Sequence, residues 1–197
     1  MGKSLWSWWE IQAIHISSSE TEVDIEDIDV AISGVMFGIF SSTGQSCIAG
    51  SRLFIHESIY DEFLERLVNE TNKLIVGDPY EKDTQVSSLI HHNHRDKVSA
   101  YVDRAIGDGG RILCGGKAPI GAEFEKGAYY LPTIIADVKS SSEIVQEEVF
   151  GPVLVVMPFK DEGDVIEQAN DSQYGLACGI WTNNFPKAWR VARAINA

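Results

Sequence analysis

The sequence predicts an α/β fold in which helices pack on a sheet. Along the chain, apolar residues at helical spacing alternate with short apolar runs of the kind that form strands. Clusters of glycine and other turn-forming residues separate these elements. The chain has 197 residues, of which 44% are hydrophobic, so it can form one sizeable core. We therefore expect a globular domain.

The expected elements follow one another in a regular order. The expected helices share apolar side chains three or four positions apart and span residues 24–40, 58–75, 91–106, 161–170 and 186–195. The expected strands are short apolar runs and span residues 52–56, 111–114, 133–138, 153–159 and 177–182. Turns are expected where glycine is dense, at residues 77–83, 107–110 and 115–127. Because strands and helices largely alternate, the helices should cover a single sheet.

Residues 1–23, MGKSLWSWWEIQAIHISSSETEV, differ from the rest of the chain. Three of the five tryptophans, Trp6, Trp8 and Trp9, fall within four positions, and the segment shows no clear hydrophobic period. We treat residues 1–23 as an atypical N-terminal segment and residues 24–197 as the folded domain. The composition leaves open whether the first segment is a tag, a packed arm or a disordered stretch.

Charge and hydropathy exclude two classes of partner. Sixteen basic and twenty-nine acidic side chains give a net charge of −13, and no cluster of Lys and Arg forms a stripe for a phosphate backbone. Nucleic acid is therefore not an expected partner. No apolar run reaches membrane-spanning length, and the first residues lack the apolar core of a signal peptide. We expect no membrane partner and a cytoplasmic location.

Cysteine and histidine spacing argues against disulfides and metal sites. The three cysteines, Cys47, Cys114 and Cys178, have no CxxC spacing and are odd in number, so at least one thiol stays free. Cys114 and Cys178 lie in expected strands, where a packed core thiol is the better interpretation. The histidines of residues 91–94 could suggest metal ligands, but on a helix only the first and last share a face. We interpret them as a polar helix start and expect no metal.

Cys47 lies in the segment GQSCIAGSR, residues 44–52, between an expected helix and an expected strand. Free cysteines are most often small buried hydrophobic residues. Here, however, the preceding residues are small and polar, so the backbone can approach a ligand and the thiol can be reached. A nucleophilic thiol also needs a nearby base, positive charge or helix N-terminus, and the sequence offers no adjacent base. On the residues alone, both interpretations stay open.

Four segments resemble, in order, motifs of the NAD(P)-dependent aldehyde dehydrogenase superfamily. They are GQSCIAGSR (44–52), VGDP (76–79), EEVFGPVL (147–154) and YGLACGIWT (174–182). The resemblance covers about residues 23–197 and corresponds to the catalytic domain of that family. It implies an open, largely parallel sheet flanked by helices, truncated at both ends relative to the family and without the family's cofactor-binding domain.

The resemblance also implies roles for individual residues. Cys47 matches the nucleophile that adds to the aldehyde, forming a thiohemiacetal and then a thioester, and its backbone N–H matches one donor to the oxyanion. Glu148 matches the carboxylate that accepts hydrogen bonds from the nicotinamide ribose, and Phe150 matches the ring beside the nicotinamide. Without the resemblance, Glu148 would be one of two solvated acidic residues and Phe150 a core residue. The implied partners are NAD or NADP, a small aldehyde and further copies of the chain.

The first segment departs from the family pattern. The general base of the family is a Glu in a segment reading roughly ELGGKSP, where this chain has residues 6–9 instead. With suitable serine and leucine codons, a one-base shift over residues 6–11, followed by restoration of one G, encodes LELGGK. We therefore expect frame-shifted coding sequence up to about Val23, with the family's frame regained near Asp24, which sequencing the coding DNA would test.

Three functions follow from these expectations. The first is aldehyde oxidation, which we expect to be weak or absent in this chain alone because the base and the adenosine site are not matched. The second is a non-catalytic folded domain that self-associates through apolar faces. The third is hydrolysis of activated esters by the thiol, which needs neither a hydride acceptor nor a cofactor.

Overall fold

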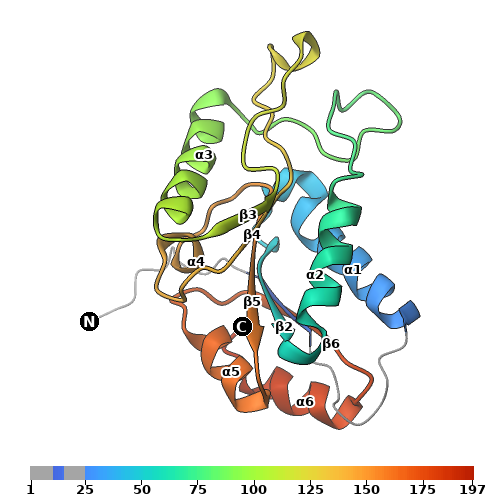
Figure 1. The fold of residues 1–197 in the computed structure, drawn as a ribbon, viewed down its shortest axis with the longest axis vertical. Helices are drawn as coiled ribbons and strands as arrows, with labels where there is room; N and C mark the ends of the chain where they lie inside the picture. The colour runs from blue at the N-terminus through green and yellow to red at the C-terminus, as the bar shows by residue number, and fades with distance from the viewer. Residues whose placement is uncertain (1–10, 16–24) are drawn as a thin grey trace.

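A single six-stranded sheet organises the computed structural model, which describes residues 11–15 and 25–197 (Figure 1). The strands are β1 (Ile11–His15), β2 (Gly50–His56), β3 (Arg111–Cys114), β4 (Thr133–Ala136), β5 (Val153–Phe159) and β6 (Ala177–Trp181). Their order across the sheet is β3-β4-β5-β2-β1-β6. All neighbours are parallel except β3 and β4, which are antiparallel. The predicted open, largely parallel sheet is confirmed.

Helices cover both faces of this sheet. They are α1 (Ile25–Phe40), α2 (Tyr60–Thr71), α3 (His92–Gly107), α4 (Glu143–Gln146), α5 (Glu162–Asn170) and α6 (Phe185–Ala194). Buried side chains of α1 and α2 belong to one hydrophobic cluster, and those of α3 to α6 belong to a second cluster on the opposite face. This division is the three-layer arrangement expected when helices connect parallel strands.

The central strands are apolar throughout because both of their faces are buried. In β5, Val153 and Val155 pack with α3, while Leu154 and Val156 pack with α1 and α2. In the parallel neighbour β2, Phe54 packs on the α3 side. Since successive side chains point to opposite faces, a strand covered on both sides reads as a continuous apolar run. The two clusters therefore meet across β2 and β5.

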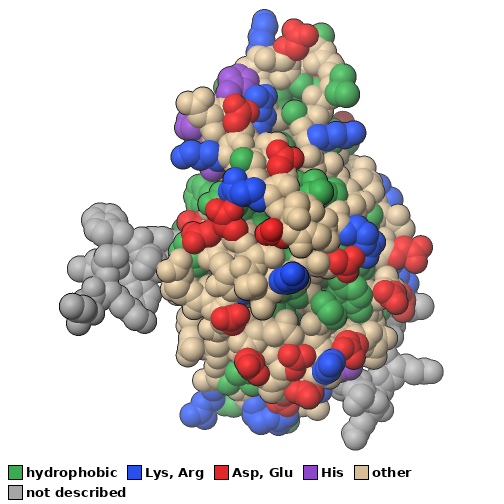
Figure 2. Space-filling view, turned by 60° about the vertical axis from the view of Figure 1, so that its left-hand side comes forward, with side chains coloured by type: hydrophobic (Ala, Val, Ile, Leu, Met, Phe, Trp, Pro, Cys, Tyr) green, Lys and Arg blue, Asp and Glu red, His purple; other side chains and the backbone are tan. Residues whose placement is uncertain are grey.

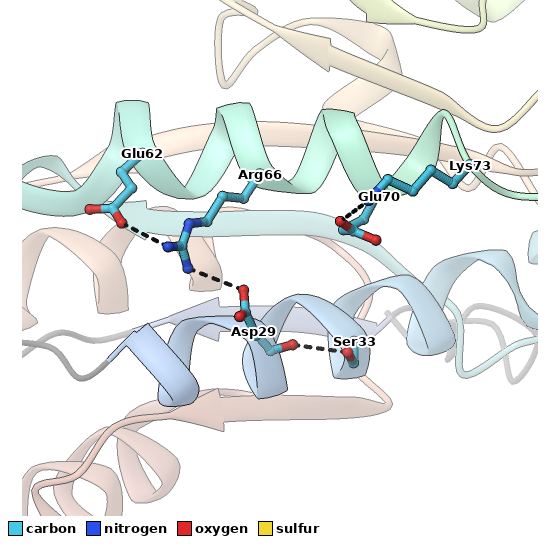
Figure 3. A network of polar contacts seen from close by, with 6 residues as sticks. All are labelled: Asp29, Ser33, Glu62, Arg66, Glu70 and Lys73. Carbon is cyan, nitrogen blue, oxygen red and sulfur yellow. Dashed lines mark hydrogen bonds and ion pairs between the residues drawn. The ribbon is translucent and has the colours of Figure 1, made fainter.

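A polar network joins α1 to α2 on the outer surface (Figure 3). The Arg66 guanidinium, on α2, donates to the Asp29 carboxylate on α1 over 3.1 Å and lies 3.5 Å from the Glu62 carboxylate one turn earlier on α2. Just after the end of α2, Lys73 pairs with Glu70 of that helix over 2.5 Å. The Asp29 and Glu62 side chains are more than half exposed, so this network orients the two helices but adds little stability.

Ten predicted elements agree with the structure to within a few residues at each end. The largest difference in length is the helix predicted over residues 58–75, which the structure divides into a short 3-10 turn, Glu57–Ile59, and α2, ending at Thr71. The sequence missed α4, which has only four residues. It also missed β1, a five-residue strand that pairs in parallel with both β2 and β6.

Strand β1 lies within residues 1–23, for which the sequence indicated no element. The interpretations offered for the rest of that segment, as a tag, an arm or frame-shifted sequence, lie outside the described residues. Across the part of the chain that the structure describes, no helix is both long enough and apolar enough to cross a membrane. On the face drawn in Figure 2, acidic and basic side chains are interspersed, and Lys and Arg do not gather into a stripe.

Candidate active site

The loop that carries Cys47 begins in a left-handed conformation. The φ angles of Ser42, Thr43 and Gly44 are 52°, 58° and 67°, and a left-handed φ is unusual for a β-branched threonine. Contacts with Ser87 hold this conformation: the Thr43 hydroxyl donates to the Ser87 carbonyl over 3.3 Å and accepts from the Ser87 N–H over 3.2 Å. The strained turn therefore aims the following residues toward β2.

Two further contacts fix the Cys47 loop against its neighbours. The Gln45 side-chain oxygen accepts a hydrogen bond from the Ile90 N–H over 2.8 Å. A side-chain carbon added to Gly44 would lie 2.1 Å from the carbonyl oxygen of Gly151, so only glycine permits this approach. The loop is thus held from one side by residues just before α3 and from the other by the turn that precedes β5.

Parallel pairing of β2 with β5 brings the two motifs together. Arg52 of β2 lies opposite Val155 of β5, so the loops that enter these strands meet at the same edge of the sheet. Cys47 lies in the first of these loops and Phe150 in the second. The pairing therefore explains why residues far apart in the sequence share one site.

All three residues proposed from the sequence line one small recess at this edge. Its lining includes Cys47, Glu148 and Phe150. Cys47 is half-buried and Phe150 is 38% exposed, so both residues can be reached from solvent. Within residues 11–15 and 25–197, the Cys47 N–H makes no hydrogen bond, whereas the N–H groups of the next two residues are taken up by Ser46. A thiol and an available backbone donor therefore lie at the same point.

The two adjacent carboxylates, Glu147 and Glu148, have different environments. The Tyr174 hydroxyl donates to Glu147 over 3.0 Å, while Glu148 lines the recess with Cys47. Burial raises the pKa of Tyr174 to about 12, and the bond to Glu147 and the charges of both carboxylates add to that increase. Glu147 therefore anchors the segment to Tyr174, and Glu148 is the carboxylate that lines the recess with Cys47.

The other two thiols belong to the core, as the sequence predicted. Cys114 is buried, and Cys178 is half-buried beside the cluster on the α3 side. Burial raises the pKa of each thiol to about 11, partly offset at Cys178 by the charge of Arg52. A thiol with such a pKa carries little thiolate near neutral pH, so neither is suited to nucleophilic attack.

The histidines form a polar helix start, as predicted. His91 is the N-cap of α3, and its Nδ1 accepts from the His94 N–H over 3.0 Å. Among the described residues, no group of three or more His, Cys, Asp or Glu side chains is arranged to hold a metal ion. The supporting roles of Thr43, Gly44 and Gln45 were not predicted; the small polar composition before Cys47 was their only sequence signal.

These features define an α/β domain in which a reachable thiol, a backbone donor, a carboxylate and an aromatic ring lie at one edge of a largely parallel sheet. The model of the aldehyde dehydrogenase family matches residues 23–197. The chain therefore belongs to the aldehyde dehydrogenase family.

Individual relatives agree with this assignment. The chain is 43% identical over 174 residues to a betaine aldehyde dehydrogenase of Brucella ovis. The matched residues make up 88% of this chain and 36% of the relative. Among solved structures, it resembles the betaine aldehyde dehydrogenase of Staphylococcus aureus in complex with NAD+, with a TM-score of 0.86, 35% identity and coverage of 94% of this chain and 35% of the other. A putative aldehyde dehydrogenase of Burkholderia cenocepacia gives a TM-score of 0.88 at 39% identity, covering 94% and 37%. This chain spans about a third of the length of these relatives.

Proposed function

We propose that this chain carries the nucleophile and the nicotinamide contacts of an NAD(P)-dependent aldehyde dehydrogenase, which oxidises an aldehyde to a carboxylic acid. The observation that carries the proposal is the shared recess of Cys47, Glu148 and Phe150. These three side chains come from two loops that meet only because β2 and β5 are parallel neighbours. Their convergence favours a common task over three unrelated structural roles.

In this proposal, Cys47 forms the covalent bond to the substrate. Its thiolate adds to the aldehyde carbonyl carbon, and the former carbonyl oxygen becomes an oxyanion. The Cys47 N–H, which has no acceptor among the described residues, is a donor to that oxyanion. Loss of hydride then leaves a thioester on Cys47, and water hydrolyses it to the acid and the free thiol.

Glu148 and Phe150 fit the nicotinamide end of a dinucleotide. A carboxylate accepts hydrogen bonds only, which suits the two hydroxyls of a ribose. The Phe150 ring is partly exposed beside the thiol and offers an apolar surface to a flat heteroaromatic ring. When bound, NAD or NADP supplies the hydride acceptor. The Staphylococcus aureus relative was solved with NAD+, which makes NAD the first cofactor to test.

Formation of reduced cofactor tests this proposal. The chain is mixed with NAD or NADP and with aliphatic, aromatic and betaine aldehydes, the last chosen from the names of the relatives. We expect slow reduction with the native chain, equal reduction with the core-thiol control Cys178→Ala, and none with Cys47→Ala. Reduction by Cys47→Ala at the native rate would contradict the role of Cys47. No reduction by any variant would favour a non-catalytic domain.

Exposed aromatic side chains support self-association as a second proposal. Phe37 on α1 and Phe185 on α6 are each 76% exposed, and Trp189 on α6 is 59% exposed. Such side chains are typical of surfaces that another chain covers. We propose a homo-oligomer, which sedimentation at increasing protein concentration would detect as a rising mass. Three free cysteines also fit a reducing compartment, so the proposed location is the cytoplasm.

A further inference from the structure

The backbone of Phe150 is held in an unusual conformation. Its φ angle is 55°, in the left-handed region that bulky side chains rarely adopt. Phe150 as a whole residue is 38% exposed, so deep burial of this residue does not fix the conformation. Such strain persists only where neighbouring contacts determine the backbone, so the turn needs an external constraint.

His94 supplies a constraint from the first turn of α3. Its Nε2 lies 2.7 Å from the Phe150 carbonyl oxygen. Because a carbonyl only accepts hydrogen bonds, the imidazole must carry its proton on Nε2 and donate it. The two rings also meet edge to face, with centroids 6.4 Å apart and planes inclined by 63°. His94 thus contacts both the backbone and the ring of Phe150.

The same face of α3 also contacts Gly151, the next residue of the turn. Val98, one helical turn after His94, is completely buried, and a side-chain carbon added to Gly151 would lie 2.8 Å from its Cγ2. The start of the helix is itself fixed, because His91 caps the His94 N–H. The N–H of Ile90, the residue before His91, donates a hydrogen bond to the Gln45 side chain in the Cys47 loop. One short segment therefore connects the Cys47 loop with the Phe150 turn.

We propose that His94 is a positioning residue: its Nε2–H holds the Phe150 carbonyl and so keeps the Phe150 ring directed at the nicotinamide position beside Cys47. The inference rests on the proposed function, in which Phe150 is a cofactor contact. His94 itself is not part of the recess lining and acts through the backbone of Phe150.

Two substitutions separate the hydrogen bond from ring packing. His94→Phe keeps an aromatic ring but has no donor, whereas His94→Gln keeps a donor but has no ring. His92→Gln changes an exposed histidine two residues earlier on the same helix and is the control. In chain labelled with 13C-phenylalanine, the Cα shift and the backbone coupling of Phe150 report its φ angle without any cofactor. We expect the left-handed values in the native chain, His94→Gln and His92→Gln, and their loss in His94→Phe. Left-handed values in His94→Phe would overturn the proposal.

A second readout connects the conformation to cofactor binding. A nicotinamide cofactor bound beside Cys47 should slow its alkylation by iodoacetamide. We expect His94→Phe to need roughly tenfold more NAD than the native chain for the same protection, with His94→Gln and His92→Gln close to native. Equal NAD requirements in all four chains would contradict the positioning role. Absence of protection in the native chain would instead refute Phe150 as a cofactor contact, while the NMR comparison still decides whether His94 holds its backbone.

Discussion

Gly44 and Gly151 approach so closely that a side-chain carbon on the first would lie 2.1 Å from the carbonyl oxygen of the second. Gly44 also has a φ of +67°, a conformation that other residues adopt only under strain. The contact joins the loop of Cys47 to the turn of Phe150 backbone to backbone. The backbones of the Cys47 loop and the Phe150 turn are therefore held against each other at this point.

Substitution of Gly44 by alanine should disrupt this contact. We expect Gly44→Ala to lower the free energy of unfolding by about 1–3 kcal/mol or more, because the new carbon is both strained and in collision with Gly151. Gly38→Ala is the matched control: Gly38 lies inside α1 with nothing within 4 Å of the added carbon. The free energy of unfolding of this control should rise by about 0.5–1 kcal/mol, because alanine reduces the conformational entropy of the unfolded chain. Urea unfolding measures both, and equal stability of the two variants would contradict the tight contact.

Alkylation should distinguish Cys47 from the other two thiols. Because burial raises the pKa of Cys114 and Cys178 to about 11, only about one in a thousand of those thiols is ionised at roughly pH 8. Cys47 is half-buried in a loop and should react first with iodoacetamide. Peptide mapping after short exposure measures the order. Equal labelling of all three cysteines in the folded chain would show that the core thiols are not protected.

Stability should fall at high pH because three tyrosines resist ionisation in the folded state. Burial raises the pKa of Tyr60, Tyr130 and Tyr174 from 10.0 to about 12. Above pH 10 the unfolded chain loses these protons and the folded chain retains them, so unfolding becomes more favourable. The stabilising contribution is complete below pH 10 and lost as the pH rises through 12. Urea unfolding from pH 9 to 12 tests this; an unchanged free energy of unfolding across that range would contradict it.

The hydrogen bond from Tyr174 to Glu147 gives a more local prediction. Tyr174→Phe removes the donor and should destabilise the chain by about 1 kcal/mol at neutral pH. Tyr80→Phe is the control, since the Tyr80 side chain is 95% exposed and should contribute nothing measurable. Thermal unfolding compares them. A control as destabilised as Tyr174→Phe would show that the bond to Glu147 does not matter.

The network between α1 and α2 should contribute little (Figure 3). Arg66→Ala removes the contacts to Asp29 and Glu62. It should lower the free energy of unfolding by only about 0.2–1 kcal/mol, because both carboxylates are largely exposed. The difference should shrink in concentrated salt, which screens exposed charges. Urea unfolding with and without salt measures it. A loss that is large and independent of salt would mean that Arg66 packs as part of the core.

Most of the fold could be predicted because its elements carry clear hydrophobic periods. Strands such as β5 are covered on both faces and read as continuous apolar runs, and α3 shows the spacing of a helix with one buried face. β1 could not be found because five residues within an irregular segment show no period. Its place is set by ladders to β2 and β6, which no local pattern reveals.

The sequence supplied candidate residues for the site but not their geometry. The motifs around Cys47 and Phe150 named the candidates, whereas their convergence depends on which strands pair. The left-handed φ of Thr43 could not be foreseen, because threonine disfavours it and the contact with Ser87, 44 residues later in the chain, helps to hold it. The hydrogen bond from His94 to Phe150 was equally hidden, since it joins residues of two separate elements.

The most direct test of the nucleophile is the position of an acyl group. The native chain is treated with p-nitrophenyl acetate, which acylates a nucleophilic thiol without any cofactor, then acidified and digested for mass spectrometry. We predict an acetyl thioester on the peptide containing Cys47, and none after the same treatment of Cys47→Ala. Acetylation of Cys114 or Cys178 in place of Cys47, or a folded native chain that takes up no acetyl group, would contradict the assignment of Cys47 as the nucleophile.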